Sequence, residues 1–351
     1  MKSVYLFGQD ITQGGANKAD ILGGKGANLA EMSRLKIPVP PGFTISTDVC
    51  NQYLKEEKIN NKIKTNIDQA LLKVEKKIKK KFGNIENPLL LSVRSGARVS
   101  MPGMMETVLN IGLTTKTIPA LIKQTKNEQF VYDSYRRLIM MYADVVMEKA
   151  EQKNHINIRE KLEKILDNQK KIKKIKKDSE LSVNDLKLII NKFKTKIKKS
   201  FGVEFPDSCE LQLWGAIQAV FKSWNGKRAV QYRNIENIPH HWGTAINVQT
   251  MVFGNLGKTS ATGVAFTRNP SNGKNKLYGE WLENAQGEDV VAGLRTPHPI
   301  NTESKTLQTK KSITLEMSWP KIYSQLLSIK TVLENHYQDM QDIEFTIESG
   351  T

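Results

Sequence analysis

The stretch LLLSVRSGARVSMPGMM, residues 89–105, sets an apolar run directly before a segment of glycines and arginines. Residues 89–93 are predicted to form a buried strand, which places Arg94 at its end. A guanidinium in that position can clamp phosphate oxygens through paired hydrogen bonds. Gly103 then offers backbone amides that no side chain obstructs, and the methionines around it are expected to be exposed. Packing would explain the methionines as core filler, but it does not explain the pair Arg94 and Arg98.

A second glycine-rich cluster, GGKG at residues 23–26, stands directly before an amphipathic helical pattern. Bare backbone amides, a helix N-terminus and the charge of Lys25 together suit an anion, above all a phosphate. The cluster is not a Walker A loop, because Ala19 and Gly26 occupy positions where that motif needs glycine and a hydroxyl residue. A tight turn with a surface lysine is the alternative interpretation.

The last residues alternate polar and apolar side chains, with DIEFTIE at 342–348 predicted to be a half-buried strand. Asp342 and Glu344 are two residues apart, so both carboxylates face the same side of that strand. Residues 349–351 then resemble a hairpin turn without its second strand. We therefore expect the chain to be a truncated piece of a longer polypeptide.

The sequence changes character twice, which predicts an α+β protein with a helical insertion. Residues 1–112 mix short strand patterns with a helix expected at about 48–81, and residues 113–205 are almost entirely helical. From about residue 206 the pattern is mixed again. It predicts a helix near 210–225 and strands at 43–46, 245–253, 263–267 and 277–282.

The net charge of +17 is concentrated in the helical stretch. Residues 149–199 hold 17 basic and 7 acidic side chains, which gives this segment a net charge of +10. The lysines alternate with apolar residues at helical spacing, which favours a solvated helix face. Nucleic-acid binding is the alternative, but no interleaved aromatic residues accompany the lysines.

Cys50 and Cys209 are the only cysteines, and they are too far apart in sequence to indicate a zinc knuckle or a disulfide framework. The apolar runs are too short to cross a bilayer, and the N-terminus lacks the features of a signal peptide. A cytoplasmic location is therefore expected, with no association with membranes.

Several motifs along the chain resemble those of the pyruvate phosphate dikinases. They are GGKGxNLAEM at 23–32, SVRSGA at 92–97 with SMPGMM at 100–105, GTAxNVQTMVFG at 243–254, GVAFTRNP at 263–270, NAQGEDVVAG at 284–293 and DxEFTIE at 342–348. These motifs run from one end of the chain to the other, and the lysine-rich insertion is the least distinctive part. The related phosphoenolpyruvate synthases carry a different segment in place of Met101–Met105, so the resemblance favours the phosphate-using dikinases.

The resemblance implies an ATP-grasp fold, in which two α+β lobes hold ATP between them. We expect lobe 1 at residues 1–112, completed by 206–243, a helical insertion subdomain at 113–205, and a C-terminally truncated lobe 2 at 244–351. Lobe 2 would end before a strand that carries further ATP contacts in the family.

The resemblance also assigns roles to individual residues. Lys25 matches the phosphate-binding lysine of the family, and Arg94 matches its essential arginine. Asp342 and Glu344 match the acidic pair that holds Mg²⁺, while Glu280 and Glu283 on a preceding strand are weaker candidates for a further ligand. The expected ATP contacts are Gly24, Lys25, Arg94, the closing loop with Ser100, Met101, Gly103, Met104 and Met105, then Thr107, the adenine hinge with Gln249, Met251 and Val252, and Glu280.

The activity implied for the whole enzyme converts ATP, phosphate and pyruvate into AMP, pyrophosphate and phosphoenolpyruvate. This chain would bind Mg²⁺, ATP and phosphate, and would phosphorylate a histidine on another domain of the same full-length chain, which is expected to be a homodimer. His155, His240, His241, His298 and His336 do not match the phosphoacceptor motif of the family. A synthase-like dikinase or another ATP-grasp phosphotransferase remains an enzyme alternative, and a nucleic-acid-binding protein is the alternative from a different class.

Overall fold

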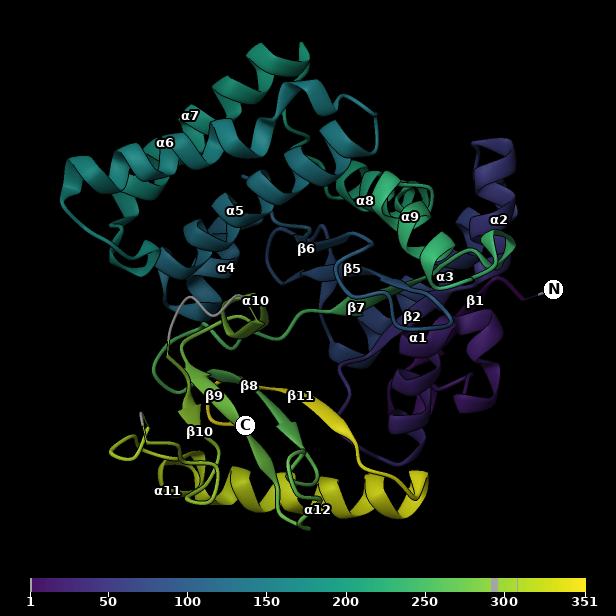
Figure 1. Ribbon diagram of the computed structural model, residues 1–351. Helices are drawn as coiled ribbons and strands as arrows, with labels where there is room; N and C mark the ends of the chain where they lie inside the picture. Colours follow the sequence, from purple (N-terminus) through teal and green to yellow (C-terminus); the bar gives the residue numbers. More distant parts are fainter. Residues whose placement is uncertain (1, 292–295, 308) are drawn as a thin grey trace. The chain divides into compact units, whose positions relative to one another are not determined.

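The structure, a computed structural model, describes residues 2–291, 296–307 and 309–351 (Figure 1). It divides into two compact units, Met1–Met251 and Val252–Thr351. Both units combine helices with antiparallel sheets, which confirms the α+β class predicted from the sequence. Among the described residues, no helix has the length and apolar character needed to cross a membrane.

The first unit is built on a five-stranded antiparallel sheet in the order β1-β2-β7-β5-β6. Strand β7 is the middle strand, although it is the last of the five in sequence. The expected second lobe began at residue 244, whereas β7 hydrogen-bonds to β2 and β5 inside the first unit. The strands of this sheet are β1 Val4–Phe7, β2 Gly42–Ile45, β5 Leu91–Gly96, β6 Thr107–Ile111 and β7 Ala245–Thr250, and a separate parallel pair is formed by β3 Lys81–Phe82 and β4 Pro88–Leu89.

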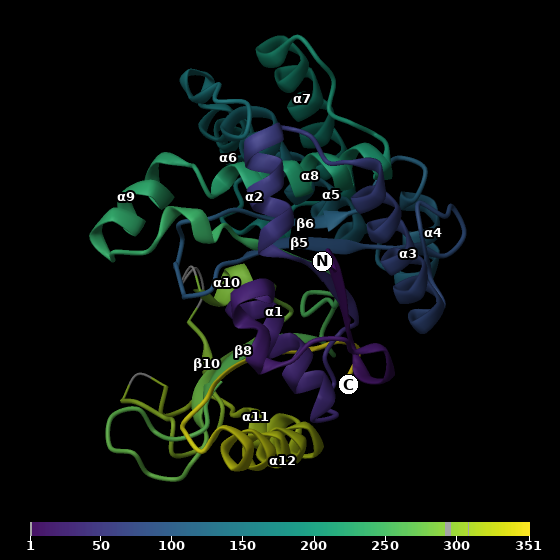
Figure 2. The same ribbon diagram turned by 90° about the vertical axis from the view of Figure 1, so that its right-hand side faces the viewer.

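Helices cover both faces of this sheet, and the register of the strands shows which residues each face presents. One face carries apolar side chains such as Phe43, Val93 and Val248, which are at most 1% exposed. Helix α1 (Ala19–Arg34) lies on the other face, and Figure 2 shows it on the opposite side of the sheet from α8. The remaining helices around the sheet are α2 Thr47–Glu56, α3 Asn61–Ile78, α8 Cys209–Ser223 and α9 Lys227–Ile235.

The single helix expected at about 48–81 is wrong, because α2 and α3 are separate helices. Glu57 has a left-handed backbone with a φ of 52° and ends α2. Asn60 then starts α3 by accepting a hydrogen bond from the backbone N–H of Ile63 at 2.9 Å. A residue with a left-handed backbone cannot continue a right-handed helix, and an asparagine cap satisfies the first free amides of the next one.

A layer of helices occupies residues 118–201, within the expected insertion. Helix α7 illustrates why it forms: Leu186, Ile189, Ile190 and Phe193 recur at helical spacing and are at most 5% exposed. Ser182 and Asp185 cap its start reciprocally. The elements of this layer are α4 Ile118–Thr125, α5 Glu128–Tyr142, a π-helical turn at Ala143–Lys149, α6 Ile158–Lys173 and α7 Val183–Phe201.

The second unit is a four-stranded antiparallel sheet in the order β10-β9-β8-β11. One face packs on α11 and α12 through a core that includes Trp281, Leu315, Leu326 and Ile347. Figure 1 shows α12 lying along this sheet. The elements are β8 Ala261–Phe266, β9 Tyr278–Glu283, α10 Gly287–Val291, β10 His298–Pro299, α11 Leu315–Ser318, α12 Pro320–Tyr337 and β11 Asp342–Ile347.

The start of α1 makes close backbone contact with the end of β5. Gly23 has a φ of 65°, and a Cβ atom at this position would overlap the carbonyl oxygen of Gly96. The next residue, Gly24, donates its backbone N–H to the carbonyl oxygen of Ala97 at 2.8 Å. Only glycine combines that backbone conformation with so close an approach. Gly23 has non-helical backbone angles inside α1, so this contact lies at a kink, after which the helical segment that carries Lys25 begins.

We predict that Gly23→Ala destabilises the first unit much more than Gly103→Ala does. Gly103 also has a positive φ, 68°, but no atom lies within 4 Å of its Cβ position. The left-handed backbone alone costs roughly 1–2 kcal/mol, and the overlap at Gly23 adds about 1–3 kcal/mol more. Chemical denaturation followed by circular dichroism measures both variants, and equal losses of stability would contradict the close-contact interpretation.

Candidate functional site

Arg94 lies on the polar face of the first sheet, within a row of hydrogen-bonding side chains. Across the strands it pairs with Asn247 of β7 and Thr107 of β6, and Asn247 pairs with Thr44 of β2. Directly opposed residues project from the same face of an antiparallel sheet. Ser92 and Gln249 form the next row on that face. This face therefore combines a cation with amide and hydroxyl groups.

The Arg94 side chain is half-buried and makes no hydrogen bond or ion pair with any residue that the structure describes. Most other described arginines have such a partner, namely Arg136, Arg137, Arg159, Arg228, Arg233 and Arg268. A partly desolvated guanidinium without a partner is a ready site for an anion.

Asn247 connects this row to the start of α1. Its side chain is fully buried, and its Oδ1 accepts a hydrogen bond from the Thr44 hydroxyl at 2.7 Å. Cβ atoms on Gly26 and Gly96 would each come within 2.8 Å of the Asn247 amide, so both glycines make room for it. Its Nδ2 has no hydrogen-bond partner among the described residues. Asn247 therefore packs α1 tightly against the strand that carries Arg94, a role that sequence reasoning missed.

Lys25 is exposed, one residue after the Gly24 amide that bonds to Ala97. The same segment of α1 packs on the polar face through Leu22 and Ala27, which contact Tyr5. Lys25 and Arg94 thus belong to two segments that are held together by the backbone contact between Gly24 and Ala97. Both residues lie within two positions of a glycine in the sequence. In the structure, Gly23, Gly24 and Gly96 are the residues at which the two backbones come into contact.

The expected exposure of the methionines after Arg94 is wrong for Met101, which is 7% exposed. Met101 packs in a small core with Ala97, Trp224 and Ala229, and Met104 and Met105 pack partly against the same core. Apolar side chains that can reach a tryptophan lose exposed area by packing on it. Ser100 and Gly103 remain exposed.

The segment after the methionines is held by Glu106 and then enters β6. The Glu106 carboxylate lies 3.2 Å from Lys149 and 3.6 Å from Arg228, and its backbone N–H donates to the Ser223 hydroxyl at 3.4 Å. Thr107, an expected ATP contact, is half-buried directly after it. The loop of residues 97–106 is therefore bound at both ends, with an exposed part around Gly103.

The expected adenine hinge, residues 249–252, contains the boundary between the two units. Gln249 is 7% exposed and donates its Nε2 to the carbonyl oxygen of Pro40 at 3.0 Å. The backbone N–H of Met251 donates to the carbonyl oxygen of Leu90 at 3.0 Å. Val252, the first residue of the second unit, is 40% exposed.

In the second unit, Asp342 and Glu344 are exposed on one face of the edge strand β11. Glu344 pairs with Val264 of β8, and Val264 pairs with Glu280 of β9, so Glu280 lies on the same face two strands away. Glu283 belongs to the opposite face, in register with Ala261 and Ile347. No group of three or more His, Cys, Asp or Glu side chains suited to a metal ion occurs among the residues described.

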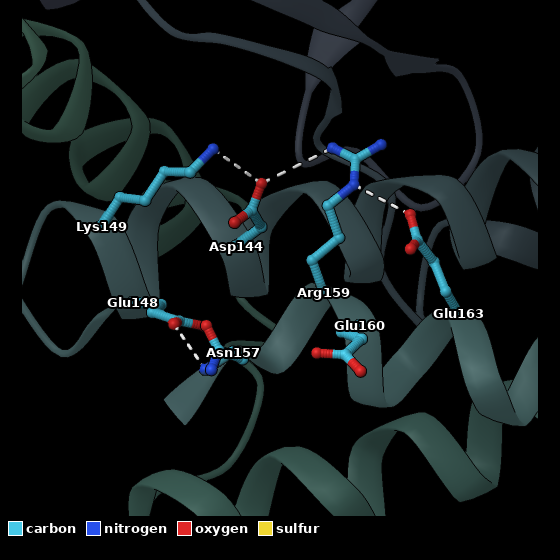
Figure 3. Close-up of a pocket in the computed structure, with 7 residues that line it drawn as sticks. All are labelled: Asp144, Glu148, Lys149, Asn157, Arg159, Glu160 and Glu163. Atoms are coloured by element: carbon cyan, nitrogen blue, oxygen red, sulfur yellow. Dashed lines mark hydrogen bonds and ion pairs between the residues drawn. The ribbon is translucent and has the colours of Figure 1, made fainter. Parts of the chain in front are cut away.

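The structure also contains a charged pocket of about 330 Å³ in the helical layer (Figure 3). Its cations are already paired: Asp144 contacts Lys149 at 2.9 Å and Arg159 at 3.6 Å, and Arg159 also contacts Glu163 at 3.0 Å. Glu148 accepts the backbone N–H of Asn157 at 2.7 Å. Acidic side chains outnumber basic ones among the residues that line it, so the pocket is unsuited to a polyphosphate.

The chain is similar in sequence to known proteins along nearly its whole length. Residues 19–88 and 62–325 match the family model described as pyruvate phosphate dikinase, AMP/ATP-binding domain. The chain is 50% identical over 351 residues to the pyruvate, phosphate dikinase of Clostridium symbiosum and 49% identical over 350 residues to that of Rhizobium meliloti (strain 1021). It is 46% identical over 351 residues to the chloroplastic enzyme of Mesembryanthemum crystallinum. These alignments cover 99–100% of this chain but only 35–38% of each relative, so the chain spans little more than a third of their length.

Partial desolvation of the carboxyl group, although its side chain is largely exposed, and the nearby negative charge of Glu344 raise the pKa of Asp342. Because the folded state holds this proton more tightly than the unfolded chain does, the contribution of Asp342 to stability is greatest at acidic pH. It is lost as the pH rises through the raised pKa. We predict that Glu344→Gln lowers the pKa of Asp342 by removing the repulsion. An NMR titration of the Asp342 carboxyl carbon measures it, and an unchanged pKa would show that the two carboxylates do not interact.

Proposed function

This chain belongs to the pyruvate phosphate dikinase family, and we propose that it binds Mg²⁺, ATP and inorganic phosphate for phosphoryl transfer to a histidine on another domain of the full-length protein. The observation that carries the proposal is the unpartnered Arg94 guanidinium on a polar sheet face, joined to the Lys25 segment by a backbone hydrogen bond. The full-length reaction would convert ATP, phosphate and pyruvate into AMP, pyrophosphate and phosphoenolpyruvate.

Lys25 and Arg94 are the proposed catalytic residues. A phosphoryl group in transfer carries negative charge on its peripheral oxygens, so the protein contributes mainly positioning and charge neutralisation. Arg94 would hold two phosphate oxygens at once through its planar fork, and Lys25 would act as a compact positive charge. Asn247, which packs α1 against this sheet, would keep the segments that carry the two cations in fixed positions.

The other proposed ATP contacts follow the polar face and the loop beside it. Gly24 would offer backbone contacts beside Lys25. Ser100, Gly103, Met104 and Met105 would close over the triphosphate, while the buried Met101 would anchor this loop on Trp224. Thr107 lies opposite Arg94 in the sheet register. Gln249, Met251 and Val252 would form the adenine hinge, with Glu280 as a further contact. In this proposal the chain is an ATP-grasp domain with a helical insertion at 113–205. Because β7 belongs to the first sheet, lobe 1 comprises 1–112 and 206–251, and lobe 2 comprises 252–351 rather than 244–351.

Asp342 and Glu344 are the residues that would hold Mg²⁺, and their chemistry suits this ion. Both are exposed oxygen donors on one strand face. Protein sites for Mg²⁺ commonly use one or two carboxylates and leave the other positions to phosphates and water. When bound, the ion would neutralise phosphate charge. Asp342 and Glu344 would hold it through their carboxylate oxygens, and Glu283, on the opposite face of the sheet, is not part of this proposal.

We predict that Arg94→Met and Lys25→Met each weaken Mg·ATP binding by about tenfold or more, because each removes a charge-assisted contact to phosphate. Arg159→Met is the matched control, since Arg159 contacts only acidic side chains of the charged pocket. Isothermal titration calorimetry with Mg·ATP measures all three variants. Near-normal affinity in Arg94→Met, with the same fold by circular dichroism, would contradict the proposed clamp.

The lysine-rich segment at the end of α6 and just after it should not contribute to nucleotide binding. Lys171, Lys173, Lys174, Lys176 and Lys177 are exposed, and charges beyond a Debye length of ~8 Å are screened at physiological salt. We predict that replacing these lysines by glutamine leaves Mg·ATP affinity within about twofold. The alternative of a nucleic-acid-binding protein predicts instead that the wild-type chain binds RNA with a steep salt dependence that the glutamine variant loses. Calorimetry with ATP and RNA separates the two.

A further inference from the structure

Arg98 lies four residues after Arg94 in the same segment, and its guanidinium lies over an aromatic ring. Its central carbon lies 5.1 Å from the centre of the Trp242 ring. A cation–π contact of this kind uses no hydrogen-bond donor, so the N–H groups of the guanidinium remain available to bind other groups. The ring thus holds the guanidinium in place without using its hydrogen-bond donors.

Those donors have no partner among the residues that the structure describes. The Nε atom of Arg98 is buried without a hydrogen-bond partner, and no described carboxylate lies within ion-pairing distance. Most buried polar groups in proteins are paired, and an unpaired one indicates a missing ion, water or ligand. Arg98 is the only permanently charged side chain among the described buried atoms that lack a partner.

The surroundings of Arg98 are held in place. The residue before it, Ala97, accepts the backbone N–H of Gly24 at 2.8 Å, so Arg98 begins beside the residue that precedes Lys25. On the other side of the stack, the short turn with Trp242 is fixed by two hydrogen bonds. Asn51 donates its Nδ2 to the His241 carbonyl oxygen at 2.9 Å, and Trp224 donates its Nε1 to the His240 carbonyl oxygen at 2.9 Å.

We propose that Arg98, oriented by Trp242, binds a second phosphate group, distinct from the one that Arg94 holds. A planar fork of N–H groups matches the oxygens of a phosphate, and the adjoining segments carry two further cations, Lys25 and Arg94. This inference rests on the proposed function. The second phosphate has two possible sources, which share this chemistry: free inorganic phosphate, or a terminal phosphate of the nucleotide.

The test is calorimetric titration of the chain with inorganic phosphate, Mg·ATP and AMP, for wild type, Arg98→Ala and Arg98→Lys. Arg159→Ala serves as the matched arginine control, and thermal unfolding checks that each variant is folded. We expect Arg98→Ala to weaken either phosphate or Mg·ATP binding by about tenfold while AMP affinity stays the same. Arg98→Lys should recover only part of the loss, because ammonium keeps the charge but not the fork.

A loss confined to inorganic phosphate would identify a free phosphate as the ligand, and a loss confined to Mg·ATP would identify a terminal phosphate of the nucleotide. Unchanged affinity for both ligands in folded Arg98→Ala would overturn the inference. The proposed function fails separately: a wild-type chain that binds phosphate through Arg98 but no nucleotide would contradict it and still support this inference. Should Arg98→Ala not fold, Trp242→Leu removes the platform and is expected to weaken the same ligand.

Discussion

The close approach of the Gly23–Gly24 backbone to residues 96–97 is the constraint on which the rest of the first unit depends. A Cβ atom at Gly23 would overlap the Gly96 carbonyl oxygen, and the Gly24 N–H bonds to the Ala97 carbonyl oxygen at 2.8 Å. This contact brings the start of a helix against the end of a strand. It therefore brings the segment that carries Lys25 next to the segment that carries Arg94. The buried amide of Asn247 reinforces the arrangement from the sheet.

The two arginines at and after the end of β5, Arg94 and Arg98, are compensated less fully than the cations of the charged pocket. In the helical layer, the charged pocket pairs its lysine and arginine with carboxylates, so its charges stabilise the fold locally. Arg94 and Arg98 have no such partners among the described residues. Leaving a partly desolvated guanidinium unpaired is unfavourable for folding alone. Groups that lower stability in this way are characteristic of binding sites, where the ligand supplies the missing partner.

Much of the fold and of the candidate site could be predicted from the sequence, because the residues that indicate each of these features lie close together in the chain. Alternation in β11, the apolar run before Arg94 and the glycines around Lys25 each indicate a conformation within a few residues. The sequence did not show that β7 is the middle strand of the first sheet, since pairing over more than 150 residues is decided by tertiary packing. Nor did it show that Met101 is buried on Trp224 or that Trp242 stacks on Arg98, because the partners are far apart in the chain. The break between α2 and α3 was missed because glutamate rarely adopts a left-handed backbone.

A crystal structure of the chain with Mg²⁺ and a non-hydrolysable ATP analogue tests the central claim most directly, because it locates every phosphate group. The account predicts phosphate oxygens within hydrogen-bonding distance of the Arg94 guanidinium and the Lys25 ammonium, on the polar face of the five-stranded sheet. Phosphates bound elsewhere, with Arg94 still unpaired, would contradict it.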